Sequence, residues 1–136
     1  MDVMEILLSA DEKLIEKLPE KEVEVIRLSE ICNGPVIFRL RALPYSRVAE
    51  IKSAAAEGDE SAEKADLHIL LAGTVSPNLK SKELREKFSA PTPAELAKRM
   101  LLAGEIADLA GEIERLSGYR RLTIKDVSAT EEIKKK

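Results

Sequence analysis

The chain has 136 residues, of which 44% are hydrophobic and only 3% are aromatic. This length and this apolar content suit one domain with a packed core and exclude a disordered chain. The net charge is −3, from 22 basic and 25 acidic residues. No apolar run approaches the roughly 20 residues of a membrane span, and we expect no contact with a membrane. The acidic first residues do not resemble a signal peptide, and the single Cys32 does not require an oxidising compartment.

The N-terminal segment, residues 2–18, is expected to be helical. Its apolar residues recur at helical spacing, and Asp2 stands where a helix cap is needed. Ser9–Asp11 is a place where this helix could break, and Pro19 ends it.

The next segment changes to the period of a β-strand. Residues 22–28 and 36–42 alternate apolar and polar side chains, apart from one slip at Ile26, and Asn33-Gly34 between them is a strong turn signal. In the second strand, the even-numbered positions form the apolar face. The pattern predicts one antiparallel β-hairpin over residues 22–42, whose apolar face has to be covered by helices.

The remainder of the domain, residues 44–118, reads as helical. Thr92-Pro93 followed by Glu95 is the clearest helix start in the chain, and Gly104 marks a later break. Residues 75–79 read as a turn-rich connector. We therefore predict an α+β fold, a predominantly helical single domain with one antiparallel β-hairpin. The expected helices are residues 44–58, 61–72, 81–88, 92–101 and 102–118.

The segment 102–118 contains a short internal repeat at heptad spacing. Two interpretations stay open: the stripe docks on the core of its own chain, or part of it meets another chain. Ala103, Gly104, Ala110 and Gly111 are small enough to let a second helix approach closely. The candidate partner-binding residues are Leu102, Ile106, Leu109, Ile113 and Leu116.

No motif in the chain indicates catalysis. His68 is the only histidine and has no second ligand at metal-binding spacing, and Cys32 has no basic neighbour in sequence. Nucleotide-binding glycine motifs are absent, and the acidic residues alternate with lysine and arginine as on solvated helix faces. We therefore expect that the protein is not an enzyme and that it has no catalytic residue, metal or cofactor.

The charge is unevenly distributed. Residues 120–136 carry a net charge of +3, so residues 1–119 carry −6. An acidic body argues against binding to a phosphate backbone. An alternative function nevertheless remains, a small regulatory or nucleic-acid-binding interaction module that uses the basic C-terminal tail.

A set of short motifs runs in order through the C-terminal half: Pro77-Asn78-Leu79, Glu83-Leu84, Phe88, Thr92 to Leu96, Leu101 to Ile106, and Leu116 to Tyr119. This series resembles the XkdN-like tail assembly chaperones of phages and prophages. The resemblance covers residues 1–119 and leaves residues 120–136 outside as a basic C-terminal tail.

The resemblance implies a non-enzymatic assembly factor in the bacterial cytoplasm. Such proteins bind the long, hydrophobic tape-measure protein, keep it soluble, help recruit tail-tube subunits and are absent from the mature virion. The implied partners are the tape-measure protein and the tail-tube protein, with a homo-oligomer as a further option. A holdase of this kind needs apolar surface that a partner helix can cover.

Overall fold

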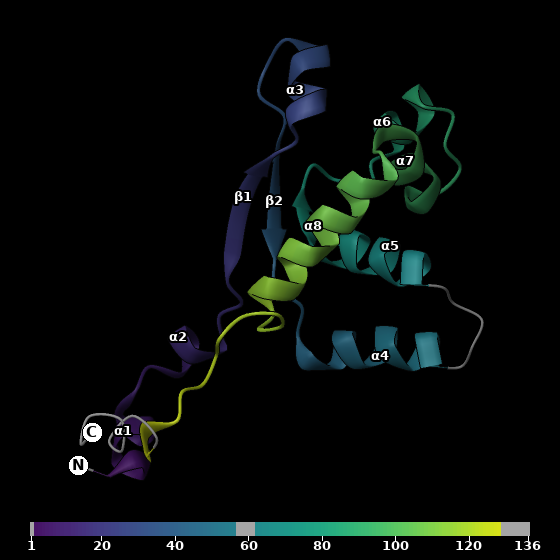
Figure 1. Ribbon diagram of the computed structural model, residues 1–136. Coiled ribbons are helices and arrows are strands. Elements are labelled where there is room, and N and C mark those ends of the chain that lie inside the picture. Colours follow the sequence, from purple (N-terminus) through teal and green to yellow (C-terminus); the bar gives the residue numbers. More distant parts are fainter. Residues whose placement is uncertain (1, 57–61, 129–136) are drawn as a thin grey trace.

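The computed structural model describes residues 2–56 and 62–128 of the chain. Within these ranges the chain forms eight helices and three strands, which agrees with the predicted α+β class. Figure 1 shows a body of sheet and helices from which α1 and α2 lead away toward the N-terminus. The elements are α1 (Val3–Ser9), α2 (Glu12–Glu16), β1 (Glu20–Glu24), α3 (Ile26–Cys32), β2 (Ile37–Arg41), α4 (Tyr45–Ala56), α5 (Ala62–Gly73), β3 (Thr74–Ser76), α6 (Lys82–Lys87), α7 (Pro93–Met100) and α8 (Ala103–Leu116).

The sheet has three antiparallel strands in the order β1-β2-β3. β1 and β2 are the two strands of the predicted hairpin. The prediction of a single hairpin is wrong in one respect, because β3 adds a third strand from the segment that we expected to be only a connector. This strand has only three residues, too few to show an alternation, and it is defined by its pairing with β2 rather than by its own sequence.

The connection between β1 and β2 also differs from the prediction. The first strand ends at Glu24, and the next residues form the helix α3 instead of continuing the strand to residue 28. Asn33 adopts a left-handed conformation with φ of 56°, and its N–H donates to the carbonyl of Ser29. The Asn-Gly signal therefore ends a helix and does not form a two-residue turn. The slip in alternation at Ile26 marks the residue where the helix begins.

The two faces of β2 are separated as the alternation predicts. Phe38 and Leu40 are fully buried, whereas Ile37, Arg39 and Arg41 are exposed. On the exposed face, Arg39 and Arg41 lie opposite Glu22 and Glu20, respectively, with N···O distances of 3.8 and 4.0 Å. One face thus carries core side chains and the other carries cross-strand charge pairs.

The core forms where α8 packs against both β2 and α5. Ile113 of α8 is fully buried against Gly73 at the end of α5. A Cβ atom at position 73 would lie 2.6 Å from the Cγ2 atom of Ile113. The missing side chain of Gly73 therefore allows the two helices to approach this closely.

The predicted helix starts are confirmed. The side chains of Ser81 and Thr92 accept hydrogen bonds from the N–H groups of Leu84 and Glu95, respectively. The break expected near Gly104 is the boundary between α7 and α8. These caps fix the residues at which α6 and α7 begin.

Candidate functional site

The predicted partner-binding stripe follows α8 and the residue before it. Leu109 and Ile113 are 5% and 0% exposed, and they belong to the core cluster. Ile106 and Leu116 are partly buried against the same cluster. Leu102, at the N-cap of α8, is 55% exposed. In the folded chain, Leu102 is therefore the one mainly exposed side chain of the five, and a role of the stripe in partner binding stays a prediction.

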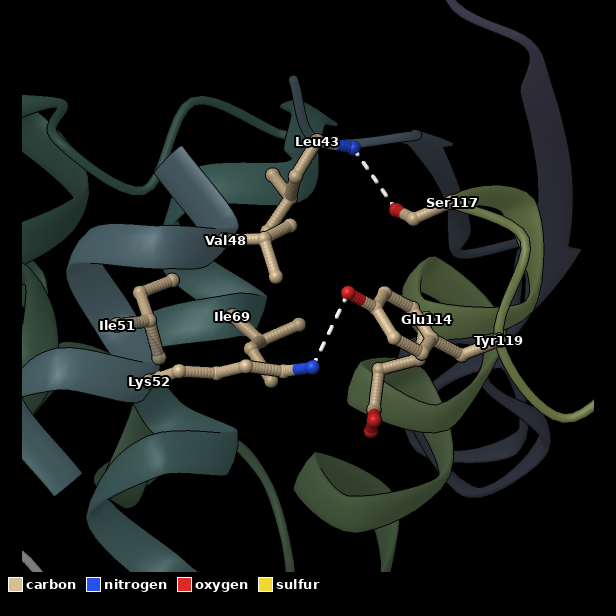
Figure 2. Close-up of a pocket in the computed structure, with 8 residues that line it drawn as sticks. All are labelled: Leu43, Val48, Ile51, Lys52, Ile69, Glu114, Ser117 and Tyr119. Atoms are coloured by element: carbon tan, nitrogen blue, oxygen red, sulfur yellow. Dashed lines mark hydrogen bonds between the residues drawn. The ribbon is translucent and has the colours of Figure 1, made fainter. Parts of the chain in front are cut away.

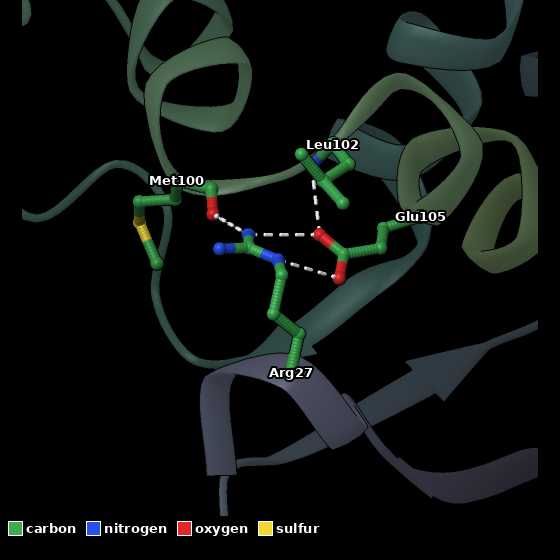
Figure 3. Close-up of polar contacts among 4 residues, drawn as sticks. All are labelled: Arg27, Met100, Leu102 and Glu105. Carbon is green, nitrogen blue, oxygen red and sulfur yellow. Dashed lines mark hydrogen bonds and ion pairs between the residues drawn. The ribbon is translucent and has the colours of Figure 1, made fainter. Parts of the chain in front are cut away.

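The tip of the hairpin is fixed to the corner between α7 and α8 by Arg27 (Figure 3). The guanidinium group donates to both carboxylate oxygens of Glu105 at 3.0 Å and to the carbonyl of Met100 at 2.8 Å. Glu105 also accepts a hydrogen bond of 2.7 Å from the N–H of Leu102. One arginine thereby fixes two segments that lie more than 70 residues apart in the sequence.

The ionised form of Glu105 is favoured by this arrangement. Hydrogen bonding from Arg27 lowers the pKa of Glu105, partial burial opposes that shift, and the N–H of Leu102 lowers the pKa further. Glu112 lies further along α8. Its pKa is lowered because it accepts a hydrogen bond from Lys21 of β1 at 2.7 Å. Both carboxylates connect α8 to the β1–α3 segment, so their charges serve the fold of the body.

A second joint fixes the C-terminal end of α8 to α4 (Figure 2). The N–H of Leu43 donates to the hydroxyl of Ser117 at 2.9 Å, and the ammonium group of Lys52 donates to the hydroxyl of Tyr119 at 3.1 Å. The Lys52 nitrogen also lies 4.3 Å from the centre of the Tyr119 ring. The cavity between these residues measures about 40 Å³. That volume is close to that of a single water molecule, so the joint is not an organic ligand site.

The exposed aliphatic side chains concentrate at the N-terminus. We call residues 2–18 the arm. Neither α1 nor α2 has a buried residue, and seven large apolar side chains of the arm are more than half exposed. They are Val3, Met4, Ile6, Leu7, Leu8, Leu14 and Ile15. An apolar surface of this density is typical of sites that contact another molecule.

The helical spacing of residues 2–18 predicts an ordinary amphipathic helix and does not by itself indicate this exposed surface. A signal was present, because Met4 and Leu8 lie beside the regular stripe and make α1 apolar on more than one side. The expected break at Ser9–Asp11 is confirmed, since α1 ends at Ser9 and Asp11 caps α2. Each resulting helix is too short to bury its apolar side chains by itself.

The two side chains considered for chemistry lie in ordinary surroundings. Cys32 is an exposed free thiol at the end of α3, and His68 lies on the exposed side of α5. In residues 2–56 and 62–128, no group of three or more His, Cys, Asp or Glu residues could hold a metal ion. No helix in the same ranges is long and apolar enough to cross a membrane.

The described part of the basic tail, residues 120–128, is exposed. Arg120 lies 3.7 Å from a carboxylate oxygen of Glu114, and the aliphatic side chains of Leu122, Ile124 and Val127 face solvent. The lysines at 134–136 lie outside the described residues. The tail therefore adds a second apolar segment that leads away from the body (Figure 1).

Comparison with known proteins identifies the family. The profile described as phage XkdN-like tail assembly chaperone protein, TAC, matches residues 4–134 and so extends past residue 119 into the basic tail. The crystal structure of the protein yqbn, a structural genomics target, superposes with a TM-score of 0.62 at 28% identity. That match covers 76% of this chain and 87% of the other. A search of curated proteins finds no match. The chain belongs to the phage XkdN-like tail assembly chaperone family.

Proposed function

We propose that this tail assembly chaperone binds the tape-measure protein of a phage or prophage and helps recruit tail-tube subunits in the bacterial cytoplasm, without entering the mature virion. Its family supports a role in tail assembly and suggests a non-enzymatic one. The observation that carries the proposal is the arm, with its seven mainly exposed aliphatic side chains. A chaperone that holds a long apolar helix needs such a surface, because burial of both surfaces provides the free energy of binding.

The charges of the arm keep this surface in solution. Residues 2–18 contain five acidic and two basic side chains, which separate the apolar positions. Like-charged arms on different copies repel one another, which opposes aggregation before a client binds. Residues 1–119 are proposed to form the chaperone domain, with the remaining 120–136 as a basic tail and Leu102 as a further contact at the α7–α8 corner.

The test is co-expression with the tape-measure protein of the same phage or prophage, followed by gel filtration of the soluble fraction. We expect the wild-type chain to keep the tape-measure protein soluble and to elute with it. The triple variant Ile6→Ser, Leu7→Ser, Leu8→Ser is expected to lose the complex while keeping its own fold, because all three side chains are exposed.

The matched control is Leu122→Ser with Ile124→Ser, which removes exposed aliphatic side chains from the tail and leaves the arm intact. Retention of the complex in this control and its loss in the arm variant would support the assignment. The proposal fails if the tape-measure protein is as insoluble with the wild-type chain as without it. A complex that survives the arm variant would refute the role of the arm, but not tape-measure binding itself.

A further inference from the structure

The arm cannot be at its most stable when it extends into water. α1 has seven residues and α2 has five, whereas isolated helices shorter than about 12–15 residues are marginal in water. Their caps, Asp2 and Asp11, supply one hydrogen bond each and do not cover any apolar area. A surface that covered the aliphatic side of α1 would therefore stabilise both the helix and the side chains on it.

A groove of suitable size opens at the base of the arm. It has a volume of about 710 Å³ and is lined by the ends of β2, α4, α5 and α7. Leu18, the last residue of the arm, forms part of its wall together with Leu43 and Leu71. The N–H of Ala42 donates to the carbonyl of Pro19 at 2.9 Å, which fixes the base of the arm at the edge of this groove.

The charges of the groove and of the arm are complementary. Arg41, Arg47 and Lys80 line the groove, and no carboxylate is among its lining residues in the described part of the chain. Arg41 and Arg47 do have partners on the surface, Glu20 and Glu50, but exposed pairs of this kind hold their side chains weakly. The arm carries a net charge of −3.

Three carboxylates of the arm are available to meet these cations. Asp2 and Asp11 are engaged as helix caps, which leaves those at positions 5, 12 and 16. The tether can reach back along the body, since residues 10–17, with α2 kept as a helix, span up to about 17 Å. At a rise of 1.5 Å per residue, α1 itself is only about 10 Å long and needs little of the groove.

We propose that in the free protein the arm folds back about Pro19 and lays the aliphatic side of α1 in the groove between β2, α4, α5 and α7 of the same chain. The arm then has two states, and the extended arm of Figure 1 is the open one. A client that binds the arm has to compete with this internal contact. The fold-back does not depend on which client is bound, so it can be tested without one.

Hydrogen–deuterium exchange of the purified chain tests the proposal. We expect the amides of α1 to exchange at least about tenfold more slowly in the wild type than in the double variant Arg47→Glu, Lys80→Glu. The matched control, Lys87→Glu with Arg99→Glu, reverses one lysine and one arginine that are exposed and do not line the groove. This control should leave protection of α1 unchanged.

Charge reversal in the arm provides a second, independent variant. Glu5→Lys with Glu12→Lys should remove the protection in the wild-type body and restore it in the Arg47→Glu, Lys80→Glu body. If α1 of the wild type exchanges as fast as in both disrupted variants, the arm does not fold back and the proposal is overturned.

The same measurement, repeated over a range of protein concentrations with light scattering, separates contact within one chain from contact between chains. Folding back within the chain gives protection that is independent of concentration and persists in the monomer. Protection that grows with concentration, together with a larger mass, shows that the arm binds a second copy instead and overturns the proposal.

Discussion

Two helices rich in aliphatic residues, α8 and α1, differ in how far their side chains are buried. In α8, Leu109 and Ile113 are nearly or fully buried, whereas in α1 the side chains of Ile6 and Leu8 are 52% and 78% exposed. α8 has fourteen residues and α1 has seven. α8 also meets Gly73 of α5, where the absence of a side chain allows close approach.

The comparison shows that helical periodicity identifies an apolar face but does not say what covers it. Both segments have aliphatic residues at helical spacing in the sequence. Length and the small residues on the facing element decide the outcome, because a close-packed interface stabilises a helix that short-range interactions alone leave marginal. In α8 these conditions are met by the core that the structure shows, whereas α1 needs a surface outside the arm, either the groove of the body or a client.

The largest difference between the two helices is expected when one side chain in each is truncated. Ile113→Ala is expected to lower the free energy of unfolding by about 2–5 kcal/mol, because it leaves a cavity between α5 and α8. Ile6→Ala removes side-chain area outside that core, so it should change the free energy by less than about 1.5 kcal/mol whether the arm is extended or folded back. Urea denaturation followed by circular dichroism measures both, and similar losses in the two variants would contradict the contrast between core and arm.

The contact between α5 and α8 can be tested from the opposite side with two glycines. Gly73→Ala places a methyl group against Ile113, and we expect a loss of about 1–3 kcal/mol from overpacking. Gly104→Ala is the control, because nothing lies within 4 Å of the added atom. Alanine there should be neutral or stabilise the helix by up to about 1 kcal/mol. If both substitutions are neutral in thermal unfolding, close approach of the helices is not required.

The sequence predicts the elements of the body well, because their signals are local. The helix starts at Ser81 and Thr92 depend on hydrogen bonds that span three residues, and the buried face of β2 follows from its alternation. The third strand and the helix α3 could not be predicted in this way. β3 exists through pairing with a strand more than 30 residues earlier, and the signal at Asn33 suits a helix end as well as a turn.

The candidate site was predictable only in part. Heptad spacing in 102–118 correctly indicates an apolar stripe, but the same spacing fits a core helix and a contact helix. Which one it is depends on α5 and β2, whose positions the stripe does not encode. The Arg27–Glu105 pair joins residues 78 apart and has no local signal at all.

A smaller effect is expected from this ion pair, which holds the body together where the arm has only local caps. The pKa of Glu105 is lowered on folding, so its carboxylate stabilises the fold above the ordinary value of 4.5, and this contribution is lost as the pH falls through the lowered value. Glu105→Gln should therefore flatten the loss of stability toward acid, while its amide oxygen still accepts from Leu102.

Urea denaturation at a series of acidic pH values measures this slope. Arg27→Met removes the cause of the shift and should flatten the slope similarly, with no further change in the double variant. Part of the slope should persist in all three, because the pKa of Glu112 is lowered by Lys21. An unchanged slope in Glu105→Gln would show that the charge of Glu105 does not help to hold the hairpin tip.

The smallest effect is expected at the joint between α4 and the end of α8. Lys52→Met keeps the apolar stem and removes both the hydrogen bond to Tyr119 and the cation over its ring, so stability should fall by less than about 1 kcal/mol. Tyr119→Phe keeps the ring and removes only the hydroxyl. Equal losses in the two variants at low salt would assign the effect to the hydrogen bond, and a loss confined to Lys52→Met would assign it to the ring. A Lys52→Met variant as stable as the wild type would mean that Leu43 and Ser117 hold this end of α8 without the lysine.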